Sequence, residues 1–174
     1  LDVYKSRIPW LLFLMLSATF SSLVIRGYES ALAAVTVLTA YIPMLTDAGG
    51  NAGSQSSTLV IRGLAVNEIT LRDFPRVLWK ELRIGMMVGT GMGVLNFIRI
   101  VIQYRDVGLA SVVGITLFCA VIAANLVGGA LPIAATKFKL DPALMASPMI
   151  TTIVDAMSLT VFFNVAIHIL PGLK

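Results

Sequence analysis

Long apolar segments separated by short polar connections make up most of the chain. Five of these segments hold almost no charge, and each is long enough to cross a hydrocarbon core of about 30 Å, which takes roughly 20 helical residues. We predict membrane-spanning helices at residues 8–25, 31–61, 84–102, 109–136 and 142–170. The chain is therefore expected to be an all-α integral membrane protein, with one transmembrane domain over residues 1–174.

The second segment is too long for a simple span. As one helix, residues 31–61 would reach about 45 Å, which exceeds the thickness of the hydrocarbon core. The segment then tilts, breaks near Gly49-Gly50 or projects from the bilayer, and the sequence leaves these three options open.

Composition and charge agree with a membrane environment. The chain is 57% hydrophobic and 13% charged, whereas soluble domains have about 25% charged residues. The net charge of +4 is spread between the apolar segments, which argues against a nucleic-acid partner. Nine of the 13 Lys and Arg residues fall on one side of the predicted membrane. The positive-inside rule then places the N-terminus in the cytoplasm and the C-terminus outside a cell membrane.

Two of the predicted helices carry a polar stripe centred on a carboxylate. In the second segment the stripe advances by four, three and four residues, with Gln55 beside it. Its members are Asp47, Asn51, Ser54 and Thr58. In the fifth segment the stripe consists of Ser147, Thr151, Asp155 and Ser158. At 100° per residue, the members of the second-segment stripe stay within about 60° of one another.

An ionised side chain at mid-membrane costs roughly 2.5–3.5 kcal/mol on insertion scales, so it needs a partner or water. Two stripes of this kind are what a hydrated path through the membrane requires. Other interpretations stay open, because Ser and Thr also bond back to their own helix. Asp155 or Asp47 could pair with Arg99 or Arg62, and Asp47 could cap a helix end.

The stretch around Asp47 is rich in glycine. Gly49, Gly50 and Gly53 permit either a local break or close helix contact. With a break, the carbonyl groups of Gly49 and Gly50 would be candidates to accept hydrogen bonds from ion-bound water. The spacing and the lysine of a phosphate-binding loop are absent.

The same residues resemble the MgtE magnesium channel family. The run from Pro43 to Thr58, continued by Arg62-Gly63-Leu64-Ala65, is similar to that family's second membrane helix. Asp141-Pro142-Ala143, Ser147-Pro148 and the run from Thr151 to Asp155 are similar to its fifth helix. The resemblance covers essentially the whole chain, and both motifs are specific.

The resemblance implies a homodimer with five helices per subunit and a pore along the two-fold axis. It implies that the second and fifth helices line the pore, and that Asp155 of both subunits forms a central Mg²⁺ site. Asp47 is a second, less firmly supported candidate. Family members also carry cytoplasmic amino-terminal and CBS domains that sense Mg²⁺. These domains are not expected within residues 1–174, so sensing and gating are not assigned to this chain.

The chemistry of the ion fits these residues. Mg²⁺ prefers oxygen ligands and gives up its water reluctantly, so a pore can hold it through its hydration shell. One Asp per chain cannot neutralise a dication, but a symmetric dimer presents two. The expected function is a Mg²⁺-selective channel pore, with an ion-coupled secondary transporter of divalent cations as the alternative. An intramembrane enzyme is disfavoured because the single histidine, His168, lies away from both stripes.

Overall fold

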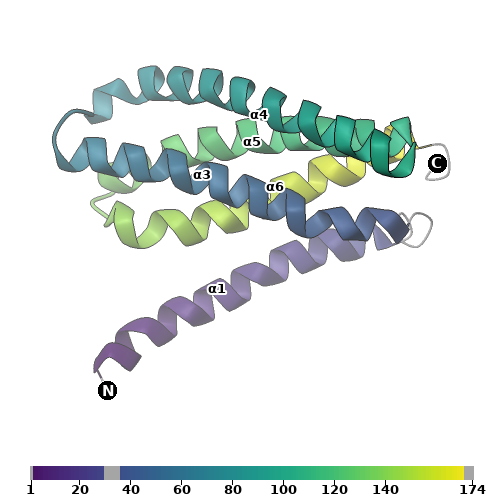
Figure 1. Ribbon diagram of the computed structural model, residues 1–174. Helices are drawn as coiled ribbons and strands as arrows, with labels where there is room; N and C mark the ends of the chain where they lie inside the picture. Colours follow the sequence, from purple (N-terminus) through teal and green to yellow (C-terminus); the bar gives the residue numbers. More distant parts are fainter. Residues whose placement is uncertain (1, 30–35, 171–174) are drawn as a thin grey trace.

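The chain folds into helices only. The computed structural model describes residues 2–29 and 36–170, without the side chains of residues 2–7, 10, 13, 14, 17, 20 and 143–148. The α-helices are α1 (Asp2–Gly27), α3 (Ile42–Ala65), α4 (Phe74–Tyr104), α5 (Val107–Lys137) and α6 (Pro142–Ile169). Two short 3-10 helices, η1 (Thr36–Tyr41) and η2 (Leu71–Asp73), precede α3 and α4. Figure 1 shows α3 to α6 packed as a bundle, with α1 diverging from it towards the N-terminus.

The predicted helical class is confirmed, and the predicted boundary at the start of α4 is corrected. This helix begins at Phe74, ten residues before the predicted start at residue 84. Hydropathy placed the start too late because Arg76, Lys80 and Arg83 interrupt the apolar pattern there. The helix is nevertheless well started, since Pro75 occupies its first turn, where a missing N–H costs nothing.

The second predicted segment is an unbroken helix through its glycines. Gly49 and Gly50 both lie inside α3, so a break at this point is excluded. The segment is divided further upstream, where η1 precedes α3, and residues 31–35 lie outside the described residues. The backbone carbonyls of Gly49 and Gly50 therefore belong to a continuous α-helix, which corrects their assignment as exposed ligands.

Three of the described helices are long and apolar enough to cross a membrane. They cover Leu71–Tyr104, Val107–Lys137 and Met149–Ile169. With 24 residues, α3 would reach about 36 Å, enough for a span. It falls short in hydropathy because polar side chains such as Asp47, Asn51 and Gln55 occupy one of its faces.

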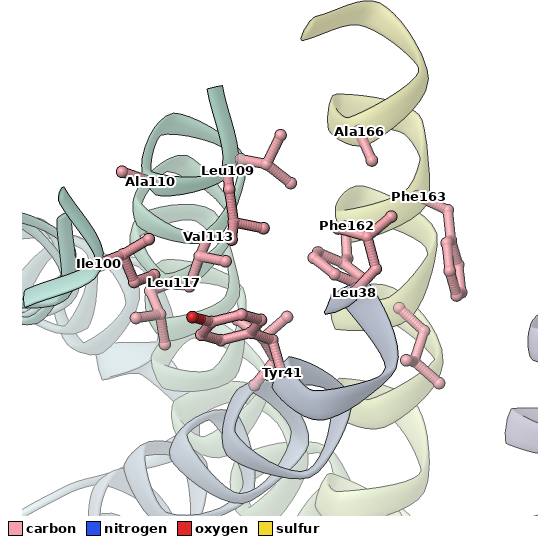
Figure 2. Packing of buried hydrophobic residues seen from close by; sticks show 13 residues of the cluster. Leu38, Tyr41, Ile100, Leu109, Ala110, Val113, Leu117, Phe162, Phe163 and Ala166 are labelled. Carbon is pink, nitrogen blue, oxygen red and sulfur yellow. The ribbon is translucent and has the colours of Figure 1, made fainter. Parts of the chain in front are cut away.

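The largest apolar core lies at the end of the bundle where α3 begins and α6 ends. Leu38 and Tyr41 of η1 meet Leu109 and Leu117 of α5 and Phe162 of α6 there (Figure 2). Phe163 also belongs to this core, and its ring stacks on Tyr28 with centroids 4.6 Å apart. Residues at the C-terminal end of α1 pack on the same core, which ties that end of the helix to the bundle.

Glycines set the spacing between the helices. A Cβ placed on Gly128 of α5 would collide with the backbone of Gly53 in α3. Between α4 and α5, a Cβ on Gly93 would lie 2.8 Å from the carbonyl oxygen of Gly114. Small residues allow this approach in lipid, where packing of helix backbones is a main source of stability.

Gly128→Ala should destabilise the bundle by about 1–3 kcal/mol, because its methyl group overlaps the backbone of α3. Gly91→Ala is the matched control, since a Cβ at Gly91 meets nothing within 4 Å. The thermal unfolding midpoint of the detergent-solubilised protein measures both. Equal midpoints for the two variants would contradict the close contact between α3 and α5.

Candidate functional site: a polar groove between α3 and α6

The helix α3 has two chemically different faces. One is formed by glycines that lie against the neighbouring helices. A Cβ on Gly49 would lie 2.6 Å from Cγ1 of Val154, and one on Gly53 would lie 2.6 Å from Cγ2 of Ile150. The other face carries the polar stripe predicted from the sequence, and the packing of the glycine face turns this stripe outward.

The stripe of α3 and two residues of α6 line one open hollow. Its volume is about 290 Å³. Thr151 and Asp155 come from α6, and the residues from α3 are Thr46, Asp47, Gly50, Asn51 and Ser54. The predicted convergence of the two stripes is thus present within a single chain.

A second hollow of about 470 Å³ continues along α3. It shares Asn51 and Ser54 with the first and extends to Gln55, Thr58 and Leu59. Together the two hollows form one trough, called here the polar groove, which runs from Thr46 to Leu59. The oxygen-bearing side chains of the groove follow one another along the helix axis.

The two carboxylates of the groove have no cationic partner among the described residues. Asp47 is exposed and Asp155 is half-buried. No ion pair joins either of them to a described Lys, Arg or His. Arg99, one of the partners considered from the sequence, instead lies 3.7 Å from the sulfur of Met44. Nothing in this part of the chain neutralises the groove.

The hydroxyl oxygens of two threonines in the groove are free to accept hydrogen bonds, because their hydrogens are donated within α3. The hydroxyl of Thr58 donates to the carbonyl of Ser54 at 2.8 Å, and that of Thr46 lies 3.1 Å from the carbonyls of Ile42 and Pro43. A hydroxyl that donates into its own helix keeps its oxygen lone pairs for another donor. The groove therefore presents these oxygens to donors such as water.

Three predicted site residues lie elsewhere or cannot be placed. Ser158 is only 1% exposed and does not line the groove. Ser158 lies against Gly49 of α3, and a Cβ on Gly49 would lie only 3.3 Å from the Oγ of Ser158. Because Gly49 has no side chain, α3 can pack directly over Ser158. Gly49 itself is buried in the same contact. The side chain of Ser147 lies outside the described residues.

The sequence analysis missed Thr46 and Leu59, which also line the groove. Each is adjacent in sequence to a stripe residue, and about 100° away on the helix. The prediction followed the stripe alone, whereas the groove is wide enough to include the neighbouring positions. No group of three His, Cys, Asp or Glu converges within the described part.

Comparison with known proteins agrees with this geometry. The model of a family named MgtE, described as a divalent cation transporter, matches residues 42–165. The chain belongs to the MgtE family. The match to the family begins at the first residue of α3 and ends within α6, so it includes both helices of the groove.

Curated MgtE relatives resemble nearly the whole chain. The magnesium transporter MgtE of Thermus thermophilus is 39% identical over 166 residues, which are 94% of this chain and 36% of the relative. The proteins of the same name from Bacillus subtilis and Enterococcus faecalis are 35% and 31% identical over 92% and 95% of the chain. The chain thus spans little more than a third of the length of these MgtE relatives.

A charged, water-soluble thiol reagent should distinguish the groove from the interface behind it. In a Cys119→Ala background, Gln55→Cys and Thr58→Cys should react at least about tenfold faster than Ser158→Cys, because thiol modification follows exposure. Mass spectrometry of protein in membranes measures the rates. Ser158→Cys reacting as fast as Thr58→Cys would contradict the packing against Gly49.

Proposed function

We propose that this chain is the membrane pore of an MgtE protein and conducts hydrated Mg²⁺ down its electrochemical gradient. The observation that supports this most is the polar groove, which holds Asp47 and Asp155 without a described cationic partner. Uncompensated carboxylates in a membrane-embedded bundle are costly. A hydrated cation that passes through the groove would balance the charge of these carboxylates while it is there. The ion itself crosses chemically unchanged.

The size of the groove suits a hydrated ion. Mg²⁺ holds six oxygen ligands in octahedral geometry and keeps its waters, and six waters occupy roughly 180 Å³ at the density of liquid water. The hollow beside Asp155 has about 290 Å³. The hollow thus has room for six waters, which supports passage of the ion with its first shell.

The chemistry of the groove suits it as well. Waters bound to Mg²⁺ direct their hydrogens outward, so the surroundings must supply acceptors. The carboxylates of Asp47 and Asp155 do so, together with the amide oxygens of Asn51 and Gln55. The lone pairs of Thr46 and Thr58 continue the series along α3. Several moderate contacts in series hold an ion while still allowing its release.

A second copy of the chain completes the pore in this proposal. The groove is open on one side, and one Asp155 carries half the charge needed to balance a dication. Two-fold symmetry would bring two grooves together and place both Asp155 carboxylates near one axis. Asp155 is then the principal ion-binding residue, acting largely through water, and Asp47 is the secondary one.

The proposed topology has five spans per subunit. α1 and α3 join the three helices that hydropathy identifies, since both exceed the roughly 20 residues that a span needs. Five spans place the termini on opposite sides of the cell membrane, with the N-terminus in the cytoplasm by the positive-inside rule.

Asp155→Asn should lower Mg²⁺ flux into liposomes by at least about tenfold, because removing both symmetry-related charges removes the main electrostatic attraction for the ion. Thr160→Val is the matched control on α6, since Thr160 is exposed and its hydroxyl donates to the carbonyl of Ala156 in its own helix. A fluorescent Mg²⁺ indicator inside the liposomes measures both. Normal flux in a well-folded Asp155→Asn protein would reject Asp155 as the principal site.

The driving force distinguishes a channel from a coupled transporter. In liposomes, Mg²⁺ uptake should follow only the Mg²⁺ gradient and the membrane potential. Imposed proton or Na⁺ gradients should not alter the reversal potential of the Mg²⁺ current, because in the proposed pore Mg²⁺ moves along the oxygens of the groove without a second ion. A fixed ratio of Mg²⁺ to protons or Na⁺ would establish the coupled transporter instead.

A further inference from the structure

The outward face of α4 changes its chemistry along the helix. Arg76, Lys80 and Arg83 follow at spacings of four and three residues in its first turns, and all three are exposed. At 100° per residue they lie within about 60° of one another. Val77 and Glu81 point away from this stripe and are buried in the bundle. The three cations thus form a basic stripe that faces away from the protein.

The same face is apolar further along the helix. Met87, Val94 and Ile98 continue the stripe at helical spacing, and they are 77%, 51% and 49% exposed. Because α4 is apolar enough to cross a membrane, this face lies against lipid. With 31 residues, α4 would be about 46 Å long and would project beyond a hydrocarbon core of about 30 Å. Its basic first turns therefore reach the headgroup layer.

Asp73 is the acidic residue that precedes the basic stripe. Its carboxylate interacts electrostatically with Arg76, but it accepts its hydrogen bonds from the backbone and hydroxyl of Thr70 at 2.9 and 2.7 Å. Among the described residues, no ion pair involves Arg76, Lys80 or Arg83. Trp79 lies beside the stripe and is 60% exposed, as is typical of residues at the membrane–water interface.

An apolar groove begins next to the basic stripe. It lies between α4 and α5, has a volume of about 300 Å³ and is lined by residues that include Gly89, Thr90, Gly93, Phe97 and Phe118. Glycines form its floor, where α4 and α5 are in backbone contact. Gly89 lies six positions after Arg83, which corresponds to about 9 Å along the helix. The groove and the basic stripe are thus within reach of one molecule.

We propose that this surface binds one anionic phospholipid. Its headgroup lies on Arg76, Lys80 and Arg83, and one acyl chain lies in the groove between α4 and α5. The direction of the basic stripe favours a lipid over a protein partner. A soluble acidic domain would approach the end of the bundle, whereas the stripe faces sideways, along the membrane plane. The site is separate from the polar groove of α3 and α6 and does not depend on the proposed conduction.

Native mass spectrometry of the detergent-solubilised protein tests the headgroup contact, with phosphatidylglycerol and phosphatidylcholine as probes. Phosphatidylglycerol should bind more tightly, and Lys80→Gln/Arg83→Gln should lower its affinity by about 25-fold, since each of the two juxtamembrane cations contributes about a factor of five. Lys137→Gln/Lys139→Gln removes the same charge elsewhere and is the control. Equal binding of the two lipids, or an equal loss in both variants, would overturn the proposal.

A second pair of variants tests the acyl chain. Thr90→Phe places a ring in the apolar groove and should weaken phosphatidylglycerol binding several-fold. Gly91→Phe adds the same ring one position along, where a Cβ meets nothing within 4 Å, and should leave binding unchanged. Both variants must keep the elution volume and unfolding midpoint of the unmodified protein. Undiminished binding by Thr90→Phe would exclude the groove from the site.

Discussion

The close approach of α3 to α5 and α6 is the contact on which the rest of the structure depends. It requires hydrogen in place of a side chain at Gly49, Gly53 and Gly128. These positions fix the rotation of α3 about its own axis, because a side chain at any of them would overlap a neighbouring helix. Once the glycine face is buried, Asp47 and Asn51 must point away from the bundle. The polar groove is in this sense a consequence of packing.

This arrangement also explains how α3 tolerates its low hydropathy. A helix with this many polar side chains is costly wherever lipid surrounds it. Its glycine face gains backbone contact with two neighbouring helices, and Ser56 adds a buried hydrogen bond of 3.1 Å to the carbonyl of Asn125. The threonines of the groove satisfy their own hydroxyl hydrogens within the helix. What remains is the free-energy cost of placing the oxygen acceptors of the groove in a membrane. These oxygens are the groups to which the water around a hydrated cation can donate hydrogen bonds.

The helical periodicity of the sequence was enough to predict which residues form the polar face of α3. It was not enough to predict which helices pack against α3. Asp47, Asn51, Ser54 and Thr58 share one stripe, and the structure brings all four to the groove. The same spacing was misleading for Ser158, since a stripe on an isolated helix does not reveal where the next helix crosses it. Hydropathy was similarly limited at α4, whose charged first turns are helical although they lie outside the apolar segment. Helix contacts, which depend on the whole bundle, could not be read from local pattern.

An open polar groove on a lipid-embedded bundle is itself an argument for a partner. Asp47 is exposed and Asp155 half-buried in the single chain, and leaving such groups against hydrocarbon costs several kcal/mol in total. The exposed face of α4, in contrast, is apolar through most of its length and becomes basic only at one end. The two surfaces thus favour different environments. Lipid suits the surface of α4, whereas in the proposed two-fold pore water and the groove of a second copy would face the two carboxylates.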